Sequence, residues 1–175
     1  KRGKISHADN QGRKGQVLAG GLQWMTTGKG IQHSEMPEGE ADDGTGQLWG
    51  FQLWVNLPKS HKMMSPRYQD IPSSLIPEKH CSNGIKVRVL AGHYQGITGP
   101  VKDIVTNPTY LDVYIPPGEQ FEYETSPTQN FFAYLYDGRA HFDFYETECV
   151  ESKSLVTFEQ LGEVITIKGN PESPV

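Results

Sequence analysis

The segment from Leu48 to Leu57, LWGFQLWVNL, shows the clearest alternation in the chain, because every second residue from Trp49 onward is apolar. A period of two places these side chains on one face of a β-strand, whereas a helix would scatter them around its axis. No segment longer than about ten residues has a convincing helical period. We therefore predict that this segment is a strand of a β-rich protein.

Shorter strand-like stretches recur along the chain, and 19 glycines and 12 prolines separate many of them. This composition is typical of short strands joined by turns and speaks against a helical bundle. We predict an all-β fold with strands at residues 4–8, 16–18, 22–25, 31–36, 48–57, 85–90, 110–115, 121–124, 130–136, 139–145, 155–158 and 163–168.

The charge balance and the two cysteines limit the function classes. Sixteen Lys and Arg against 21 Asp and Glu give a net charge of −5, which argues against a general nucleic-acid binder because phosphate contacts are mostly cationic. No stretch approaches the roughly 20 apolar residues that a membrane-spanning helix needs, so we expect no membrane association. Cys81 and Cys149 are too few for a disulfide framework and too far apart for a zinc site. Free thiols suit the cytoplasm, or the nucleus of a eukaryotic cell.

The composition changes between residues 58 and 84, where four prolines interrupt any regular element. We interpret this stretch as an ordered linker between a first lobe, residues 1–57, and a second lobe, residues 85–175. Within the first lobe, residues 37–46 form an acidic segment that we expect to be a surface loop.

The two lobes share a weak sequence similarity. In an alignment with a four-residue slip, Gly3 falls on Gly138 and Gly30 falls on Gly169. The similarity predicts a duplicated β-barrel unit. Four predicted strands precede Gly138 in the second copy and none precedes Gly3, so we expect that the first copy begins in mid-domain.

His33 and Glu35 lie two residues apart in the segment GIQHSEMP. On a strand, both side chains point to the same face. A convergent imidazole and carboxylate are the beginning of a transition-metal site. The spacing alone also fits a solvated pair on a strand surface.

Two long stretches resemble the pirin family: GGLQWMTTGKGIQHSEMP and LWGFQLWVNLPKSHKMMSPRYQ. The resemblance continues through IKVRVLAGHYQGITGP, TYLDVYIPPGEQFEYE and NFFAYLYDGRAHF. Pirins are bicupins, with two cupin-type β-barrels in one chain. The resemblance implies that residues 1–57 are the C-terminal part of an N-terminal cupin barrel, 58–84 a Pro-rich linker, and 85–175 a C-terminal cupin barrel with its end missing. We expect the polypeptide to continue beyond both ends.

The resemblance also implies a metal site. In pirins the N-terminal barrel holds one iron, as Fe(II) or Fe(III), whose ligands are two histidines of an upstream His-Pro-His segment and the His and Glu of the HSEMP segment. His33 and Glu35 match the latter two, and the His-Pro-His segment is expected upstream of Lys1. The resemblance further implies that Glu35 is a catalytic base. The family counterpart of His7 is not a ligand, so we expect His7 at the surface or behind the ligands.

The second barrel is expected to hold no metal. At an offset of 139 residues, His33 falls on Glu172 and Glu35 falls on Pro174, which has no donor atom in its side chain. Glu172 alone cannot supply the several convergent ligands that a transition metal requires. We expect apolar and aromatic groups at the inward positions of this barrel, among them Phe131, Tyr134, Tyr136, Phe142 and Phe144.

Three functions remain open on the sequence. The resemblance implies a quercetin 2,3-dioxygenase-type enzyme that oxidises a flavonol with O2. The alternative is an iron- or redox-dependent transcriptional co-regulator that binds a transcription factor without turnover. A metal-free β-scaffold is the third. In each case we expect a monomer.

Overall fold

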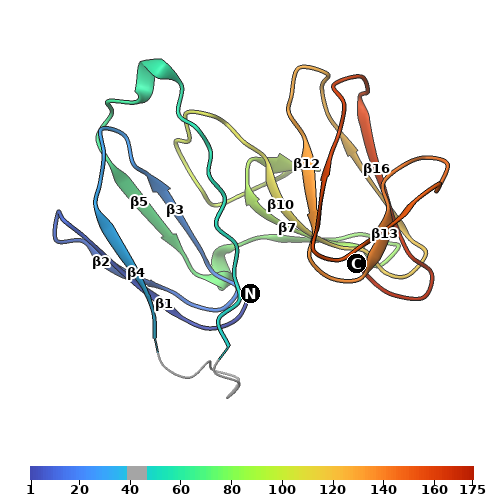
Figure 1. Cartoon of the computed structure of the whole chain (residues 1–175), viewed down its shortest axis with the longest axis horizontal. Helices are drawn as coiled ribbons and strands as arrows, with labels where there is room; N and C mark the ends of the chain where they lie inside the picture. The colour runs from blue at the N-terminus through green and yellow to red at the C-terminus, as the bar shows by residue number, and fades with distance from the viewer. Residues whose placement is uncertain (39–46) are drawn as a thin grey trace. The chain divides into compact units, whose positions relative to one another are not determined.

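The computed structural model describes residues 1–38 and 47–175, and its regular structure is β-strand apart from two 3-10 turns (Figure 1). The all-β prediction is therefore confirmed. No helix in the described ranges has the length and apolar character needed to cross a membrane. The chain forms two compact units: unit 1 contains residues 1–77 and 88–111, and unit 2 contains residues 78–87 and 112–175.

Unit 1 contains a three-stranded antiparallel sheet of order β2-β1-β4 and a separate antiparallel pair, β3-β5. The register places His7 opposite Gly15 on one side and opposite Glu35 on the other. A short β8-β9 hairpin also belongs to this unit. The elements of unit 1 are β1 (Ile5–Asp9), β2 (Lys14–Val17), β3 (Leu22–Thr26), β4 (His33–Pro37), η1 (Lys59–His61), β5 (Arg67–Ile71), η2 (Ser73–Leu75), β8 (His93–Tyr94) and β9 (Ile97–Thr98).

Unit 2 contains a four-stranded sheet of order β11-β16-β13-β14 and an antiparallel pair, β12-β15. Its strands are β11 (Gln120–Glu124), β12 (Phe132–Leu135), β13 (Arg139–His141), β14 (Cys149–Glu151), β15 (Ser154–Thr157) and β16 (Val164–Gly169). A further sheet has the order β10-β7-β6 and consists of β6 (Glu78–His80), β7 (Lys86–Ala91) and β10 (Tyr110–Tyr114).

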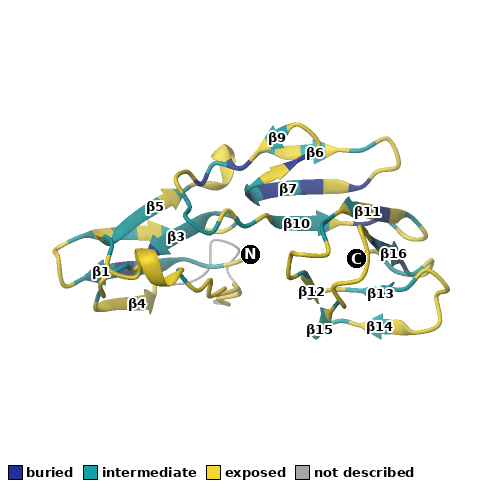
Figure 2. Cartoon of the chain, turned by 90° about the horizontal axis from the view of Figure 1, so that it is seen from above, coloured by how far each residue is buried: buried dark blue, intermediate teal, exposed yellow. Residues whose placement is uncertain are grey.

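Burial alternates along the central strands, as the strand period requires. On β7, Val87, Val89 and Ala91 are completely inaccessible, and the residues between them are partly exposed (Figure 2). On β16, Ile165 and Ile167 follow the same pattern. These inward apolar positions form the core.

The prediction of a strand at Leu48–Leu57 is wrong. Trp49 makes an isolated antiparallel bridge with Arg2, and residues 51–58 belong to no strand. The indole of Trp54 is 86% exposed. An alternating pattern indicates an extended segment with one apolar and one polar face. A strand also needs a neighbouring strand that completes its backbone hydrogen bonds. The hydrogen-bonded bridge of this segment is the one between Trp49 and Arg2.

Two strands lie inside residues 58–84, where the sequence predicted an ordered linker. Strand β5 pairs with β3 over five residues, from Leu22 opposite Ile71 to Thr26 opposite Arg67. Strand β6 is the outer strand of the β10-β7-β6 sheet. Both were missed because prolines flank short, polar segments, and neither RYQDI nor EKH has the apolar alternation of a half-buried strand.

The aromatic filling predicted for the second lobe is right in part. Phe131 and Phe142 both contact the ring of Phe158, with centroids 5.1 and 6.3 Å away. Phe144 is instead 82% exposed, and Tyr134 is 44% exposed. The predicted strand 139–145 ends at His141, so its alternation does not carry Phe144 inward.

Truncating the core on β7 should destabilise the chain. Val89→Ala removes two buried methyl groups and should lower the free energy of unfolding by about 2 kcal/mol. The matched control is Val164→Ala, because Val164 lies on a strand but is 52% exposed, and it should cost less than about 0.5 kcal/mol. Urea unfolding of both variants checks this, and equal losses would contradict the assignment of the core.

Candidate functional site

Four titratable side chains gather on one face of the sheet in unit 1. Strand β1 is central, and its His7 lies opposite Glu35 of β4, while Asp9 lies opposite His33. Directly opposed residues of an antiparallel pair project to the same face of the sheet. The register therefore brings two imidazoles and two carboxylates together on that face.

The predicted pair lies on β4, the outer strand. The Nε2 atom of His33 is 3.8 Å from Oε1 of Glu35, and both side chains are about one-third exposed. The amide Nε2 of Gln52 donates a hydrogen bond of 3.4 Å to the other carboxylate oxygen, Oε2. The pair is thus accessible, and it offers one nitrogen atom and one oxygen atom that could coordinate a metal ion.

The imidazole nitrogen of His33 and the carboxylate oxygens of Glu35 suit a transition metal, but they are only part of a ligand set. Imidazole nitrogen and carboxylate oxygen are both common ligands of non-haem iron. In residues 1–38 and 47–175, however, no group of three or more His, Cys, Asp or Glu residues is arranged to hold a metal ion. His33 and Glu35 fit as part of a metal site and do not complete one.

His7 is buried on the same face of the sheet, opposite Glu35. Only 5% of the residue is accessible, and its Nε2 atom is 3.3 Å from Oδ2 of Asp70 on β5. The amide of Gln23 donates a hydrogen bond of 2.9 Å to the other oxygen of the same carboxylate. The imidazole also stacks on Tyr68, with ring centroids 5.5 Å apart and planes 18° apart. Of the two positions expected for His7, the buried one is found.

Tyr68 is a site residue that the sequence analysis did not single out. Its ring lies against His7 on β1, and the guanidinium carbon of Arg13 is 4.8 Å from the ring centroid. Its hydroxyl is buried and makes no hydrogen bond of standard geometry within the described part of the chain, although the Asp9 carboxylate lies close enough for a weak one. Burial, with the nearby charges of Asp9 and Glu35, raises the pKa of Tyr68, so the hydroxyl is a proton donor at neutral pH.

Asp9 lies close to this hydroxyl, but its carboxylate accepts hydrogen bonds from residues of its own turn. Its Oδ1 atom accepts from the backbone N–H groups of Gln11 and Arg13, and its Oδ2 atom accepts from Nε of Arg13 at 2.7 Å. Burial opposes ionisation, but these hydrogen bonds and the positive charge outweigh it and lower the pKa of Asp9. Asp9 is therefore an anion that fixes the turn after β1.

Strand pairing and ion pairs place several further residues. On β3, Met25 is opposite Tyr68, which puts the two side chains on one face, and Trp24 points to the other face. In the acidic segment, Glu38 pairs with Lys4 at 3.0 Å, whereas Glu40, Asp42 and Asp43 lie outside the described residues. Both cysteines are free thiols.

Comparison with known proteins identifies relatives of this chain. The model of the family described as Pirin matches residues 1–55. A pirin-like protein of Caulobacter vibrioides is 41% identical over 138 residues, which cover 78% of this chain and 49% of the relative. Pirin-1 of Arabidopsis thaliana is 38% identical over 158 residues, covering 89% of this chain and 52% of that protein. The chain thus spans about half the length of the curated relatives it matches.

Solved structures share the fold. The crystal structure of quercetin 2,3-dioxygenase from Acinetobacter baumannii superposes with a TM-score of 0.77 at 24% identity, covering 97% of this chain and 62% of the enzyme. The bacterial pirin YhhW from Escherichia coli, crystallised in complex with nickel(II), gives a TM-score of 0.59 at 15% identity and covers 98% of this chain and 66% of YhhW.

The buried hydroxyl of Tyr68 has a measurable consequence. Tyr68→Phe removes a buried hydroxyl that makes no hydrogen bond of standard geometry, so it should leave the free energy of unfolding unchanged or raise it by up to about 1 kcal/mol. The matched control is Tyr136→Phe, because the hydroxyl of Tyr136 donates to Oδ1 of Asp112 at 2.8 Å, and its loss should cost about 1.5 kcal/mol. Chemical denaturation compares the two, and an equal loss would show that the Tyr68 hydroxyl is satisfied.

Proposed function

We propose that this chain, which belongs to the pirin family, is part of a bicupin non-haem iron protein that oxidises a flavonol with O2, as a quercetin 2,3-dioxygenase does. In this proposal residues 1–57 contribute to the metal-binding barrel and residues 85–175 to a second barrel without metal. The protein would act in the cytoplasm as a monomer. The observation that carries the proposal is the His33–Glu35 pair on β4, whose imidazole and carboxylate are 3.8 Å apart and partly accessible.

His33 and Glu35 would hold the iron together with ligands from elsewhere in the protein. The chain contains no His-Pro-His segment, which supplies the remaining ligands in pirins. Two ligands bind a divalent ion only weakly, since affinity depends on several donors being held in place. When bound, iron would supply a binding position for the substrate and for O2.

The residues of this chain suggest how a flavonol would be bound and deprotonated. The free lone pairs of the Glu35 carboxylate can accept the proton of a substrate hydroxyl, which makes Glu35 the general base. Gln52 donates to Oε2 of Glu35 and so holds the carboxylate in one orientation. Tyr68, whose hydroxyl is buried and whose pKa is raised, stays uncharged and adds no negative charge near Glu35. His33 serves as a ligand.

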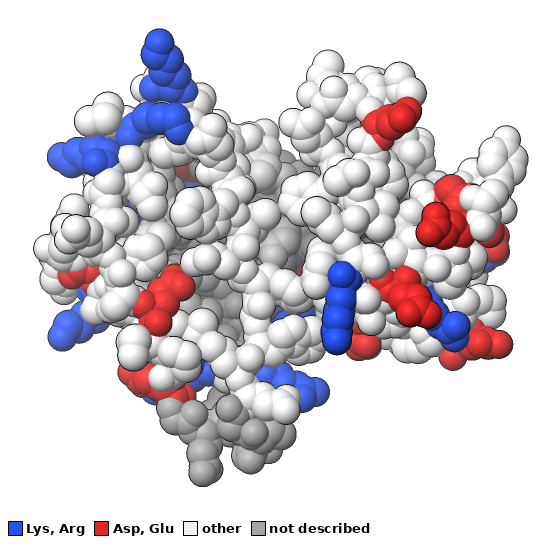
Figure 3. Space-filling view, viewed as in Figure 1, with Lys and Arg blue, Asp and Glu red and all other residues white. Residues whose placement is uncertain are grey.

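A second candidate is a co-regulator that binds a transcription factor in an iron- or redox-dependent way, without turnover. The exposed apolar side chains of residues 48–55 favour it, because apolar patches of this kind mark protein contacts. Direct nucleic-acid binding has less support. Acidic and basic side chains occur on both units in the face shown in Figure 3, and the net charge is −5.

Iron content and oxygen uptake together test the proposal on the full-length protein. His33→Ala should weaken iron binding at least about tenfold, because it removes a ligand. Glu35→Gln should keep more of the iron but lower O2 uptake with quercetin more strongly, since the amide cannot act as a base. The control is His61→Ala, whose imidazole hydrogen-bonds Ser60 on an exposed turn, and both properties should be unchanged.

The outcomes separate the candidates. Iron-dependent O2 uptake supports the enzyme, whereas bound iron without uptake supports the co-regulator. Unchanged iron content in both His33→Ala and Glu35→Gln would overturn the ligand assignment.

A further inference from the structure

Unit 2 contains a cavity that the proposed function does not use. It has a volume of about 140 Å³ and lies where β11 ends and β16 begins. Tyr123 and Glu124 pair there with Ile165 and Val164, and the N–H group of Thr125 donates to the carbonyl of Glu163 at 2.8 Å. The cavity is therefore framed by a hydrogen-bonded strand end.

Aromatic rings that hold one another in place form one wall of the cavity. Phe131 and Phe158 meet edge to face, with centroids 5.1 Å apart and planes 77° apart. Phe131 also contacts Tyr123 at 5.7 Å, and Phe158 contacts Phe142 at 6.3 Å. Because each ring is fixed by neighbours, a ligand ring can pack against this wall without first ordering it.

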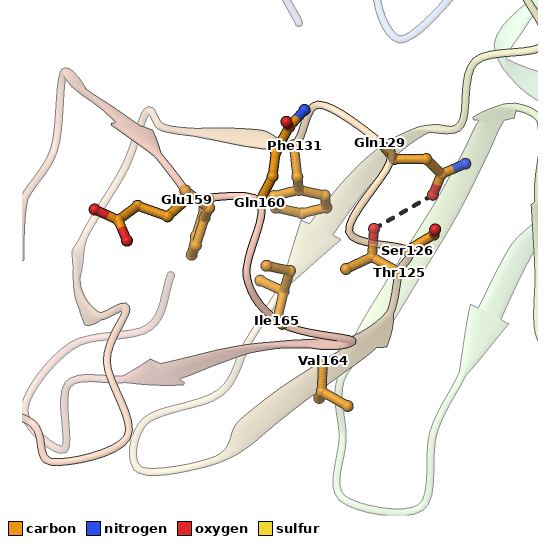
Figure 4. Close-up of a pocket in the computed structure, with 10 residues that line it drawn as sticks. Thr125, Ser126, Gln129, Phe131, Glu159, Gln160, Val164 and Ile165 are labelled. Atoms are coloured by element: carbon orange, nitrogen blue, oxygen red, sulfur yellow. Dashed lines mark hydrogen bonds between the residues drawn. The ribbon is translucent and has the colours of Figure 1, made fainter.

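The opposite wall is aliphatic and one end is polar. Figure 4 shows the side chain of Ile165 pointing toward the ring of Phe131, with Thr125 at one end of the space between them. The Thr125 hydroxyl donates to Oε1 of Gln129 at 3.3 Å, so its oxygen still has lone pairs that can accept a hydrogen bond. The carboxylate of Glu159 points away from Phe131.

The size of the cavity and the charges of its lining residues limit the chemical class of a ligand that could bind there. An apolar cavity of about 150 Å³ lined by Leu, Ile and Phe can bind benzene. This cavity has a similar volume and therefore room for one aromatic ring, but its lining also includes polar side chains, among them Thr125 and Gln129. Its lining residues include no Lys, Arg or His and one acidic residue, Glu159. An anionic ring would therefore lack a counter-charge, whereas a neutral ring with one hydroxyl could donate to Thr125.

We propose that unit 2 has a binding site for a small neutral phenol, with the ring packed between Phe131 and Ile165 and the hydroxyl donating to Oγ1 of Thr125. A second hollow of about 310 Å³ lies against the same two rings, Phe131 and Phe158, and is also lined by Phe132 and Leu155. Phe131 is thus a wall of both spaces, which makes it the residue whose loss should affect binding most.

The test uses fluorine NMR on the full chain with 4-fluorophenol, fluorobenzene and 4-fluorobenzoate. 4-Fluorophenol should bind saturably, fluorobenzene more weakly, and 4-fluorobenzoate most weakly. All three tryptophans, at 24, 49 and 54, lie in unit 1, so tryptophan fluorescence would not report on this site. Amide chemical shifts should instead move at Gly162 and Ile165 and not at His33 and Glu35.

Two variants test the two parts of the site. Phe131→Leu should weaken 4-fluorophenol binding by about tenfold, because the ring wall is lost, and the matched control Phe144→Leu should have no effect because that ring is 82% exposed. Thr125→Val should reduce the affinity for 4-fluorophenol to that for fluorobenzene and leave fluorobenzene unchanged. If Phe131→Leu loses the dispersed amide spectrum of a folded protein, Thr125→Val carries the test.

Three results would overturn the proposal. The first is the absence of saturable binding of 4-fluorophenol to the folded chain. The second is equal binding of 4-fluorophenol by the wild-type chain and the Thr125→Val variant. The third is a set of amide shifts centred on His33 and Glu35, which would place the phenol at the site of the proposed dioxygenase and not in unit 2.

Discussion

The buried imidazole of His7 is the contact on which the arrangement of unit 1 depends. It stands on the central strand β1 and reaches Asp70 and Tyr68 on β5, so it joins the β2-β1-β4 sheet to the β3-β5 pair. The contact between His7 and Asp70 requires a glycine on the neighbouring strand β2. A Cβ atom at Gly15, directly opposite His7, would overlap Nε2 of His7 and Oδ2 of Asp70. One glycine therefore makes room for the contact that joins the β2-β1-β4 sheet to the β3-β5 pair.

The sequence predicted the strands whose pattern is local and failed where a strand depends on its partner. Strands β1, β3, β7 and β11 were found because their alternating residues end at turn residues such as Gly12 and Gly118. The segment RYQDI became β5 because β3 offers a free edge, although its own composition is polar. The segment LWGFQLWVNL has the better pattern, but in the described part of the chain it is held by an isolated bridge at Trp49 and not by a strand ladder. Periodicity describes the faces of a segment and contains no information on which segment lies beside it.

The candidate site also contains residues that the sequence could predict and residues that only the packing of strands brings together. His33 and Glu35 could be proposed from the sequence because they are two residues apart on one strand and match a family motif. Tyr68 and Asp70 could not, because more than thirty residues separate them from Glu35 and only the packing of β5 brings them close. The buried position of His7 was one of two expectations, and choosing between them required the register of β1 against β2 and β4.

Strand β4 is the outer strand of its sheet, and all five of its residues are exposed. Neither His33 nor Glu35 is among the buried residues of the core, so exchanging them should cost less stability than exchanging a buried residue. His7, by contrast, could not be replaced without leaving Asp70 and Tyr68 without their neighbour. The ligand pair is thus open to natural variation while the buried His7 is constrained. A lineage can change the metal that such a strand prefers, or abandon metal binding altogether, and retain a folded protein at every step.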